Sequence, residues 1–156
     1  NKKYTYTDVC WLLNWKVEEV PLNIGGYKYD KYTNTYPVFI NYDKSEEVSA
    51  SIRYEDRFVD QSRLIAISKS QRTIASDDVD NAIHAEERHI LMPLFVRKNK
   101  DDKTSKEFYF LGTIKHNGHL QEFIMPDTDK SAVEIGYHLN TPVENNLYEY
   151  ITERTI

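Results

Sequence analysis

The chain contains 156 residues, 40% of them hydrophobic and 29% charged, and its 25 acidic residues outnumber 20 Lys and Arg to give a net charge of −5. This length suffices for one domain with a buried core, and no apolar run approaches the roughly 20 residues of a membrane span. The single Cys10 excludes an internal disulfide and a cysteine-based zinc cage, so we expect a reducing, cytoplasmic setting. The acidic balance argues against a protein that coats nucleic acid indiscriminately, but it allows a local basic face.

The N-terminal part of the chain predicts a helix followed by a hairpin. The helix covers residues 5–15, since Thr5 can cap it and Asp8, three residues later, completes a capping box. Residues 27–43, YKYDKYTNTYPVFINYD, predict two strands joined by a turn around the central Thr-Asn pair. Pro37 restricts the second strand, because proline can only begin a strand or lie on a sheet edge.

The remainder of the chain is dominated by strands. Residues 63–67 predict a short strand, and residues 76–87 predict a helix with Ser76 as its cap and acidic residues in its first turn. Four strands and a final helix follow, at residues 90–98, 107–115, 119–125, 132–139 and 143–151. Asn117-Gly118 is the residue pair typical of a type I′ turn, so we expect a hairpin turn between the second and third of these strands.

These elements predict a single strand-dominated α+β domain over residues 1–156. In the last strand the apolar residues alternate and face one way, namely Val133, Ile135, Tyr137 and Leu139. Many short antiparallel strands with two or three short helices usually close into a barrel or half-barrel, which leaves binding to the loops at its ends. An open antiparallel sheet with helices on one face is the alternative.

The candidates for chemistry are weak. His116 and His119 stand at HxxH spacing, but the expected turn offers them no third metal ligand. Asp127, Asp129 and Lys130 resemble part of a metal-dependent nuclease motif, which would need its second acid and its lysine on a strand. We therefore predict neither a catalytic residue nor a metal site, and we expect these side chains to be solvated turn residues.

One segment departs from the acidic balance of the chain. Residues 63–76, RLIAISKSQRTIAS, contain no acid, whereas residues 77–87 contain five acids and no Lys or Arg. Hydroxyl, ammonium and guanidinium groups are typical phosphate ligands, which predicts contacts to a nucleic-acid backbone from Ser68, Lys69, Ser70, Arg72 and Thr73. A second basic stretch, RKNKDDKTSK, adds Arg97 and Lys98, although a solvated hairpin turn explains it equally well.

Aromatic residues gather in the first third of the chain. Six tyrosines fall within 28 residues: Tyr27, Tyr29, Tyr32, Tyr36, Tyr42 and Tyr54. About half are expected in the core or in cross-strand pairs, and the others could stack on a base. The sequence YEDRF, residues 54–58, places two carboxylates beside an aromatic ring, and a carboxylate can accept a hydrogen bond from the exocyclic amine of cytosine. An ion pair of these acids with Arg53 or Arg57 is the alternative.

The order of these motifs resembles a known family. In chain order the motifs are YTYTDVCWLLNW, GGYKYDKYTNTYPVFINYDK, SIRYEDRF, SKSQRTIAS, LMPLFVRKNKDD, EFYFLG and TPVENNLYEYI. Over residues 4–151 this series is similar to a C-terminal domain, of unknown function, in bacterial proteins that join a phospholipase-D-type nuclease to a superfamily-two helicase. Characterised members are type IV restriction enzymes of the SauUSI kind, which cut DNA carrying methylated or hydroxymethylated cytosine.

The resemblance implies a DNA target-recognition module of a larger restriction endonuclease. It implies ATP and Mg for the parent enzyme and no cofactor in this domain. The implied partners are double-stranded DNA carrying modified cytosine and the helicase and nuclease domains of the same chain. The start at Asn1 rather than Met agrees with a fragment of a longer protein. The expected fold is a curved antiparallel sheet or pseudobarrel, SRA-like or restriction-effector-like.

Positions carried over from the family extend the candidate site. Lys44, which follows Tyr42 at a strand end, joins the predicted phosphate contacts. The predicted modified-base pocket consists of Tyr29, Tyr42, Tyr54, Glu55 and Asp56. The base could be flipped into such a pocket or its methyl group could be contacted in the major groove, and the tyrosine cluster favours flipping. A non-catalytic docking or regulatory module is the alternative function, which the acidic net charge favours.

Overall fold

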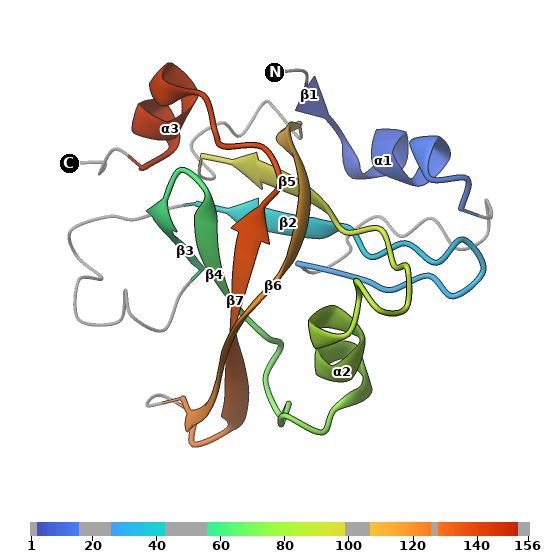
Figure 1. The fold of residues 1–156 in the computed structure, drawn as a ribbon, viewed down its shortest axis with the longest axis vertical. Helices are drawn as coiled ribbons and strands as arrows, with labels where there is room; N and C mark the ends of the chain where they lie inside the picture. Colours follow the sequence, from blue (N-terminus) through green and yellow to red (C-terminus); the bar gives the residue numbers. More distant parts are fainter. Residues whose placement is uncertain (1–2, 16–25, 43–55, 99–106, 126–127, 153–156) are drawn as a thin grey trace.

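A computed structural model of the protein describes residues 3–15, 26–42, 56–98, 107–125 and 128–152. The elements follow in the order β1 (Lys3–Tyr4), α1 (Tyr6–Leu12), β2 (Val38–Asn41), β3 (Arg57–Asp60), β4 (Arg63–Ile67), α2 (Asp77–Ile83), β5 (Pro93–Arg97), β6 (Phe108–Ile124), β7 (Ser131–Leu139) and α3 (Asn145–Thr152) (Figure 1). The strands form one sheet in the order β2-β5-β6-β7-β4-β3, and β1 pairs with β6. No helix in the described ranges is long and apolar enough to cross a membrane.

The sheet is curled so that its two ends approach each other. β2 and β3 stand at opposite ends of the strand order. Nevertheless the hydroxyl of Tyr42, directly after β2, accepts a hydrogen bond at 3.1 Å from the backbone N–H of Phe58 in β3. In Figure 1, β2 runs across the direction of β7, and its end lies beside β3 and β4. The predicted strand-dominated, curved fold with short helices is confirmed.

The main hydrophobic core fills the inside of the curl. The alternating apolar positions of β7 are all buried, as the sequence predicts: Val133, Ile135, Tyr137 and Leu139. α2 contributes Val79 and Ala82 to this core, and α3 contributes Ile151. A second, aromatic cluster lies under α1 and contains Val9, Cys10, Trp15, Phe39, Phe95 and Phe108. The helices are too short to be stable in isolation, so the burial of their apolar side chains in the core stabilises them.

The helix starts agree with the capping signals. The Asp8 N–H donates to Thr5 Oγ1 at 3.1 Å, and the Thr5 N–H donates to the Asp8 carboxylate at 2.9 Å, which is the predicted capping box. Ser76 precedes α2, but its hydroxyl accepts a hydrogen bond from the Thr73 N–H at 2.8 Å and makes no bond to the helix. Ser76 thus braces the preceding loop and not the helix.

The predicted hairpin over residues 27–43 is only half formed. Residues 27–30 make two isolated bridges, Tyr27 with Val38 and Asp30 with Thr35, in place of a strand. The Asp30 carboxylate instead accepts hydrogen bonds from the N–H and hydroxyl of Thr33 at 2.9 and 2.5 Å, so the side chain organises the turn. β2 pairs in parallel with β5, whereas the sequence predicted antiparallel strands throughout.

Asn117-Gly118 does not form the predicted hairpin turn. β6 continues through this pair, and its register with β7 shifts between His116 and Leu120, so residues 117–119 oppose Gly136 alone. Gly118 has φ of 100°, a conformation that side chains disfavour, and the Asn117 Oδ1 accepts a hydrogen bond from the N–H of His119 at 3.0 Å. β6 and β7 consequently form one long ribbon with a bulge in its middle.

Gly136 leaves no room for a side chain beneath this bulge. A Cβ atom at Gly136 would lie 2.4 Å from Asn117 Oδ1 and 2.7 Å from His119 Cβ. We expect Gly136→Ala to lower the free energy of unfolding by about 1–3 kcal/mol, because the bulge must shift. Urea denaturation measures the change. The control is Gln121→Ala at an exposed position of the same ribbon, for which we expect less than about 0.5 kcal/mol; equal effects would contradict the packing argument.

Candidate nucleic-acid interface

A pocket lies where the two ends of the curled sheet approach each other. Its volume is about 200 Å³, and it is lined by Gly26, Tyr27, Val38, Phe39, Ile40, Asp56, Ala66, Ile67, Ser68 and Lys69. β2 supplies an apolar wall, and β4 with the residues after it supplies the opposite wall. Polar groups enter from Tyr27, Asp56, Ser68 and Lys69. This combination of an apolar wall and a few directed polar groups is typical of a small-molecule or single-base site.

Tyr27 is fixed as an aromatic wall of the pocket. Its hydroxyl donates a hydrogen bond to Asp78 Oδ2 at 2.6 Å and accepts one from the backbone N–H of Lys69 at 3.0 Å. Its ring stacks on that of Tyr36, with centroids 5.5 Å apart and planes 13° from parallel. Burial, followed by the hydrogen bond to Asp78, raises the pKa of Tyr27, so the hydroxyl remains a donor. The ring orientation is therefore determined by contacts on three sides.

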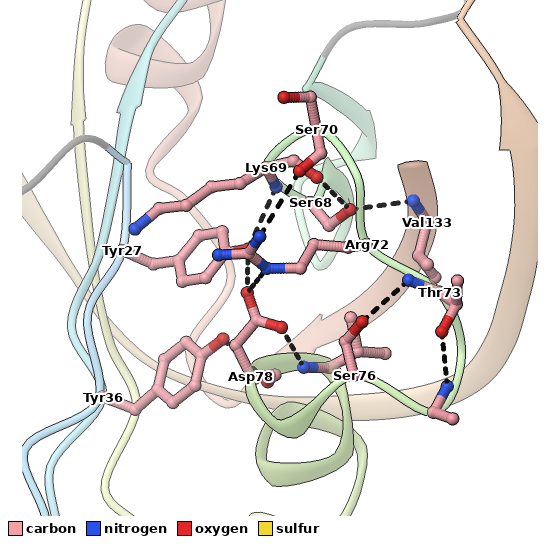
Figure 2. A network of polar contacts seen from close by, with 12 residues as sticks. Tyr27, Tyr36, Ser68, Lys69, Ser70, Arg72, Thr73, Ser76, Asp78 and Val133 are labelled. Carbon is pink, nitrogen blue, oxygen red and sulfur yellow. Dashed lines mark hydrogen bonds and ion pairs between the residues drawn. The ribbon is translucent and has the colours of Figure 1, made fainter. Parts of the chain in front are cut away.

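Asp78, in the first turn of α2, joins the helix to the pocket and to the basic loop. Besides Tyr27, its Oδ2 accepts a hydrogen bond and ion pair from Arg72 Nε at 2.8 Å (Figure 2). Burial by itself raises the pKa of Asp78, but the hydrogen bonds from Tyr27 and Arg72 outweigh it and hold the pKa below its usual value. The carboxylate is thus charged at neutral pH and offsets part of the positive charge of Arg72.

Ser68 belongs to the pocket wall. Its side chain is buried, its hydroxyl donates to the backbone oxygen of Lys69 at 2.9 Å, and it accepts from the Val133 N–H at 2.8 Å. The Ser68 N–H also donates to the Val133 oxygen at 2.9 Å. These bonds attach the start of the loop to β7, so the structure gives Ser68 a positioning role, whereas the sequence suggested a phosphate contact.

The other predicted loop residues differ in orientation. Ser70 and Thr73 are exposed, whereas Lys69 and Arg72 are partly exposed and extend over the Tyr27 ring and to Asp78 (Figure 2). The loop is braced because Gln71 N–H donates to the Ser131 oxygen at 2.7 Å. Lys69 lines the pocket, and Arg72 pairs with Asp78, whose Oδ2 also accepts from the Tyr27 hydroxyl. Two cationic side chains of the loop thus lie beside the aromatic wall.

The predicted base-pocket residues separate into three groups. Asp56 lines the pocket, and its Oδ1 accepts a hydrogen bond from the Ile67 N–H at 2.7 Å. Tyr42 is buried in the core, where it joins β2 to β3. Tyr29 is partly buried against the core, and its hydroxyl donates to Asn34 Oδ1 at 2.7 Å. Tyr54, Glu55 and Lys44 lie outside the described residues. Tyr27 was one of the six clustered tyrosines, but no local signal distinguished it from its neighbours.

Asp56 is also held through its neighbour Arg57. The Arg57 guanidinium pairs with Glu134 Oε1 at 3.0 Å, and the other Glu134 oxygen contacts His119 Nε2 at 2.6 Å. Burial raises the pKa of Glu134, but hydrogen bonds from His119 and Arg57 hold it below its usual value. This cluster ties β3 to the β6–β7 ribbon. The described part of the chain contains no group of three or more His, Cys, Asp or Glu placed to hold a metal.

Arg97 and Lys98 lie apart from the basic loop. Arg97 lies over the ring of Phe108, 4.5 Å from its centroid, and donates to the side chain of Asn41. Lys98 lies over the ring of Tyr150 in α3, 4.8 Å from its centroid. Figure 1 shows the end of β5 and α3 at the top of the view, whereas the segment between β4 and α2 lies at the bottom. Arg97 and Lys98 therefore do not share a patch with the loop between β4 and α2; residues 99–106 of the second basic stretch lie outside the described residues.

Comparison with known proteins gives a family and a fold. Residues 1–151 match the family model DUF3427, described as a domain of unknown function. No curated protein matches the chain. The structure is similar to the SRA domain of SUVH5 in its complex with hemimethylated CG DNA, at a TM-score of 0.56, 10% identity, and coverage of 92% of this chain and 89% of that one.

Two further SUVH5 SRA complexes show the same likeness. The complex with methylated CHH DNA gives a TM-score of 0.51 at 13% identity and covers 86% of each chain. The complex with fully methylated CG DNA gives 0.52 at 12% identity, with coverage of 92% of this chain and 90% of that one. The protein thus has an SRA-like fold, as the sequence analysis expected.

The charge on Asp78 predicts how stability depends on pH. A carboxyl group whose pKa is depressed in the folded protein contributes stability above its unfolded pKa of about 3.9, and this is lost as the pH falls through the folded pKa. We expect Asp78→Asn to lower the unfolding free energy by about 1–3 kcal/mol at neutral pH, and the deficit to shrink below about pH 4. Urea denaturation across pH measures both.

Asp77→Asn is the matched control for this experiment. Asp77 is exposed in the same first turn of α2. We expect its substitution to change stability by less than about 0.5 kcal/mol. A deficit in Asp78→Asn that stays constant down to about pH 2 would show that the charge on Asp78 contributes nothing.

Proposed function

The chain belongs to the DUF3427 family, and from its SRA-like fold and its pocket we propose that it recognises methylated cytosine in double-stranded DNA. The observation that carries the proposal is the pocket between β2 and β4, which combines an aromatic ring, a carboxylate and an apolar wall beside the cations Lys69 and Arg72. The similar structures were solved in complexes with methylated DNA, and that likeness supports the same class of ligand for this protein.

The size of the pocket suits one base and not a base pair. An apolar cavity of about 150 Å³ holds benzene, so a cavity of about 200 Å³ accommodates a single pyrimidine ring. A base inside a duplex reaches such a cavity only after it leaves the stack, which costs a few kcal/mol. We therefore propose base flipping, with the cost offset by contacts of the base in the pocket and of the backbone at its mouth.

Asp56 is the residue that we assign to cytosine recognition. Its carboxylate is oriented by the Ile67 N–H, and a carboxylate offers about four acceptor positions over its two oxygens. The exocyclic amine of cytosine is a donor, whereas thymine carries an oxygen acceptor at that position. A fixed carboxylate beside the base thus selects cytosine.

The apolar wall of β2 is where the methyl group would be detected. Val38 and Ile40, which share one face of β2, supply its carbon surface. Burying one methyl group contributes about 0.8 kcal/mol, which is a preference of roughly four-fold. This is a modest discrimination, so affinity must come mainly from base stacking, the bond to Asp56 and phosphate contacts. A requirement for more than one engaged site in a larger assembly would multiply the preference.

Lys69 and Arg72, with the exposed hydroxyls of Ser70 and Thr73, are the proposed phosphate contacts. They lie on one loop, which enters the pocket lining at Lys69 and is attached to β7. The net charge of −5 of the whole chain limits binding to DNA at other surfaces. From the motif series described above, we propose that the domain serves target recognition within a type IV restriction endonuclease. The helicase and nuclease domains of that enzyme would use ATP and Mg.

Titration with three otherwise identical duplexes tests this function. The duplexes carry unmodified cytosine, 5-methylcytosine or 5-hydroxymethylcytosine, and each is measured at two salt concentrations. We expect a modified duplex to bind more tightly, by at least about four-fold for methylcytosine, because the pocket buries the methyl group. Equal affinity for all three duplexes, or no binding, would contradict the proposal and favour a docking module of a helicase–nuclease.

Two substitutions separate base contacts from phosphate contacts. We expect Asp56→Asn to lower affinity for the methylated duplex about ten-fold or more, because an amide N–H₂ would face the cytosine amine. We expect Arg72→Ala to weaken all three duplexes alike and to reduce the salt slope by about 0.9. Arg63→Ala is the control, since Arg63 pairs with Asp60 at 2.7 Å at the opposite end of β4. Unchanged affinity of Asp56→Asn for the methylated duplex would argue against a role of Asp56 in the pocket.

A further inference from the structure

The Lys69 side chain occupies one face of the Tyr27 ring. Its Nζ lies 4.7 Å from the ring centroid, and the Tyr36 ring stacks on Tyr27 at 5.5 Å. Figure 2 shows the Lys69 side chain on the side of the Tyr27 ring that faces away from Tyr36. Both faces of the aromatic wall are therefore covered. A base can stack on Tyr27 only if the Lys69 side chain leaves.

The position of Lys69 is a balance of opposing interactions. The ammonium is attracted to the π-electrons of Tyr27 and to Asp78. Burial lowers the pKa of Lys69, and the neighbouring charges of Arg72 and Lys28 lower it further, so the charged form is less stable here than in water. Lysine carries its charge on a flexible four-carbon stem, which allows the ammonium to move without movement of the backbone.

The backbone of Lys69 is fixed independently of its side chain. Its N–H donates to the Tyr27 hydroxyl at 3.0 Å, and its carbonyl oxygen accepts from the Ser68 hydroxyl at 2.9 Å. The side chain can therefore swing outward while the pocket wall stays in place. At the mouth of the pocket, beside Arg72, a DNA phosphate would offer the ammonium a stronger partner than a tyrosine ring does.

We propose that Lys69 is a specificity-determining gate, which makes the pocket select a modified base attached to a sugar–phosphate backbone over the free nucleoside. This rests on the function proposed above. A free nucleoside must displace the ammonium from Tyr27 and offers nothing in return. A flipped nucleotide brings a phosphate that receives the ammonium, so the loss of the cation–π contact is compensated and the ring face opens for stacking.

Opposite changes in two affinities test the gate. The probes are 5-methyl-2′-deoxycytidine and a duplex containing 5-methylcytosine, titrated into the wild type and into Lys69→Ala. We expect Lys69→Ala to bind the nucleoside about three- to thirty-fold more tightly, because no cation–π contact has to be broken. We expect the same variant to bind the duplex more weakly, with a salt slope smaller by about 0.9.

Two further variants control for charge and for folding. Lys69→Arg retains a cation on the same loop, and we expect it to retain preference for the duplex over the nucleoside. Lys115→Ala removes one positive charge from β6, where Lys115 pairs with Glu86 at 3.7 Å, and we expect both affinities to match the wild type. Thermal unfolding checks that each variant is folded. We expect the Lys69 variants to remain folded, because the bonds that fix this position come from its backbone.

The outcomes distinguish the gate from the proposed function. Weaker or unchanged nucleoside binding by Lys69→Ala would overturn the gate while leaving methylcytosine recognition intact, provided that the wild type prefers the methylated duplex. A wild type without that preference would overturn the proposed function and the gate together. Tighter nucleoside binding with weaker duplex binding supports both.

Discussion

The curl of the sheet is the constraint on which the rest of the molecule depends. β2 and β4 are not neighbours in the strand order, yet they face each other because the sheet bends back on itself. A bond from the Phe58 N–H to the Tyr42 hydroxyl closes the seam at one point. β2 does not pair with β3 or β4 in the described sheet, so the space between β2 and β4 forms a pocket whose walls are the strands themselves.

The polar groups around that pocket form a connected system. The Asp78 carboxylate accepts hydrogen bonds from Tyr27 and Arg72, and the Lys69 N–H donates to the same tyrosine hydroxyl (Figure 2). The Ser68 hydroxyl attaches the loop to β7. A connected network costs little when every member has a partner, but the loss of one member leaves another buried and unsatisfied. The same network explains how an acidic protein presents a basic face. Asp78 of α2 offsets part of the charge of Arg72, and Lys69 keeps a second positive charge on the same loop.

Specificity in such a site is limited by the small energy of one methyl group. A single buried methyl is worth a few-fold preference, whereas a carboxylate on the cytosine amine and contacts to phosphate are each worth more. On the function proposed above, cytosine identity and attachment to a backbone would be selected strongly, and methylation would be selected weakly. A stronger preference for methylated DNA would then require several domains engaged on one DNA.

Local sequence patterns determined most helices and strands and indicated the kinds of side chain in the site. Only the tertiary structure decided which of these side chains meet in the pocket. The Thr5–Asp8 capping box, the strand at 63–67 and the alternation in β7 depend on residues at most a few positions apart, so the sequence predicted them correctly. The pair Asn117-Gly118 suits both a tight turn and a β-bulge, so the local sequence does not distinguish the two. The pairing of β6 with β7 on both sides of Gly136 makes it a bulge. The site joins residues 27, 56, 69 and 78, which lie in separate segments and meet only because the sheet curls. For that reason the sequence indicated tyrosines, a carboxylate and a basic loop, while the fold selected Tyr27 over Tyr29 and Tyr42.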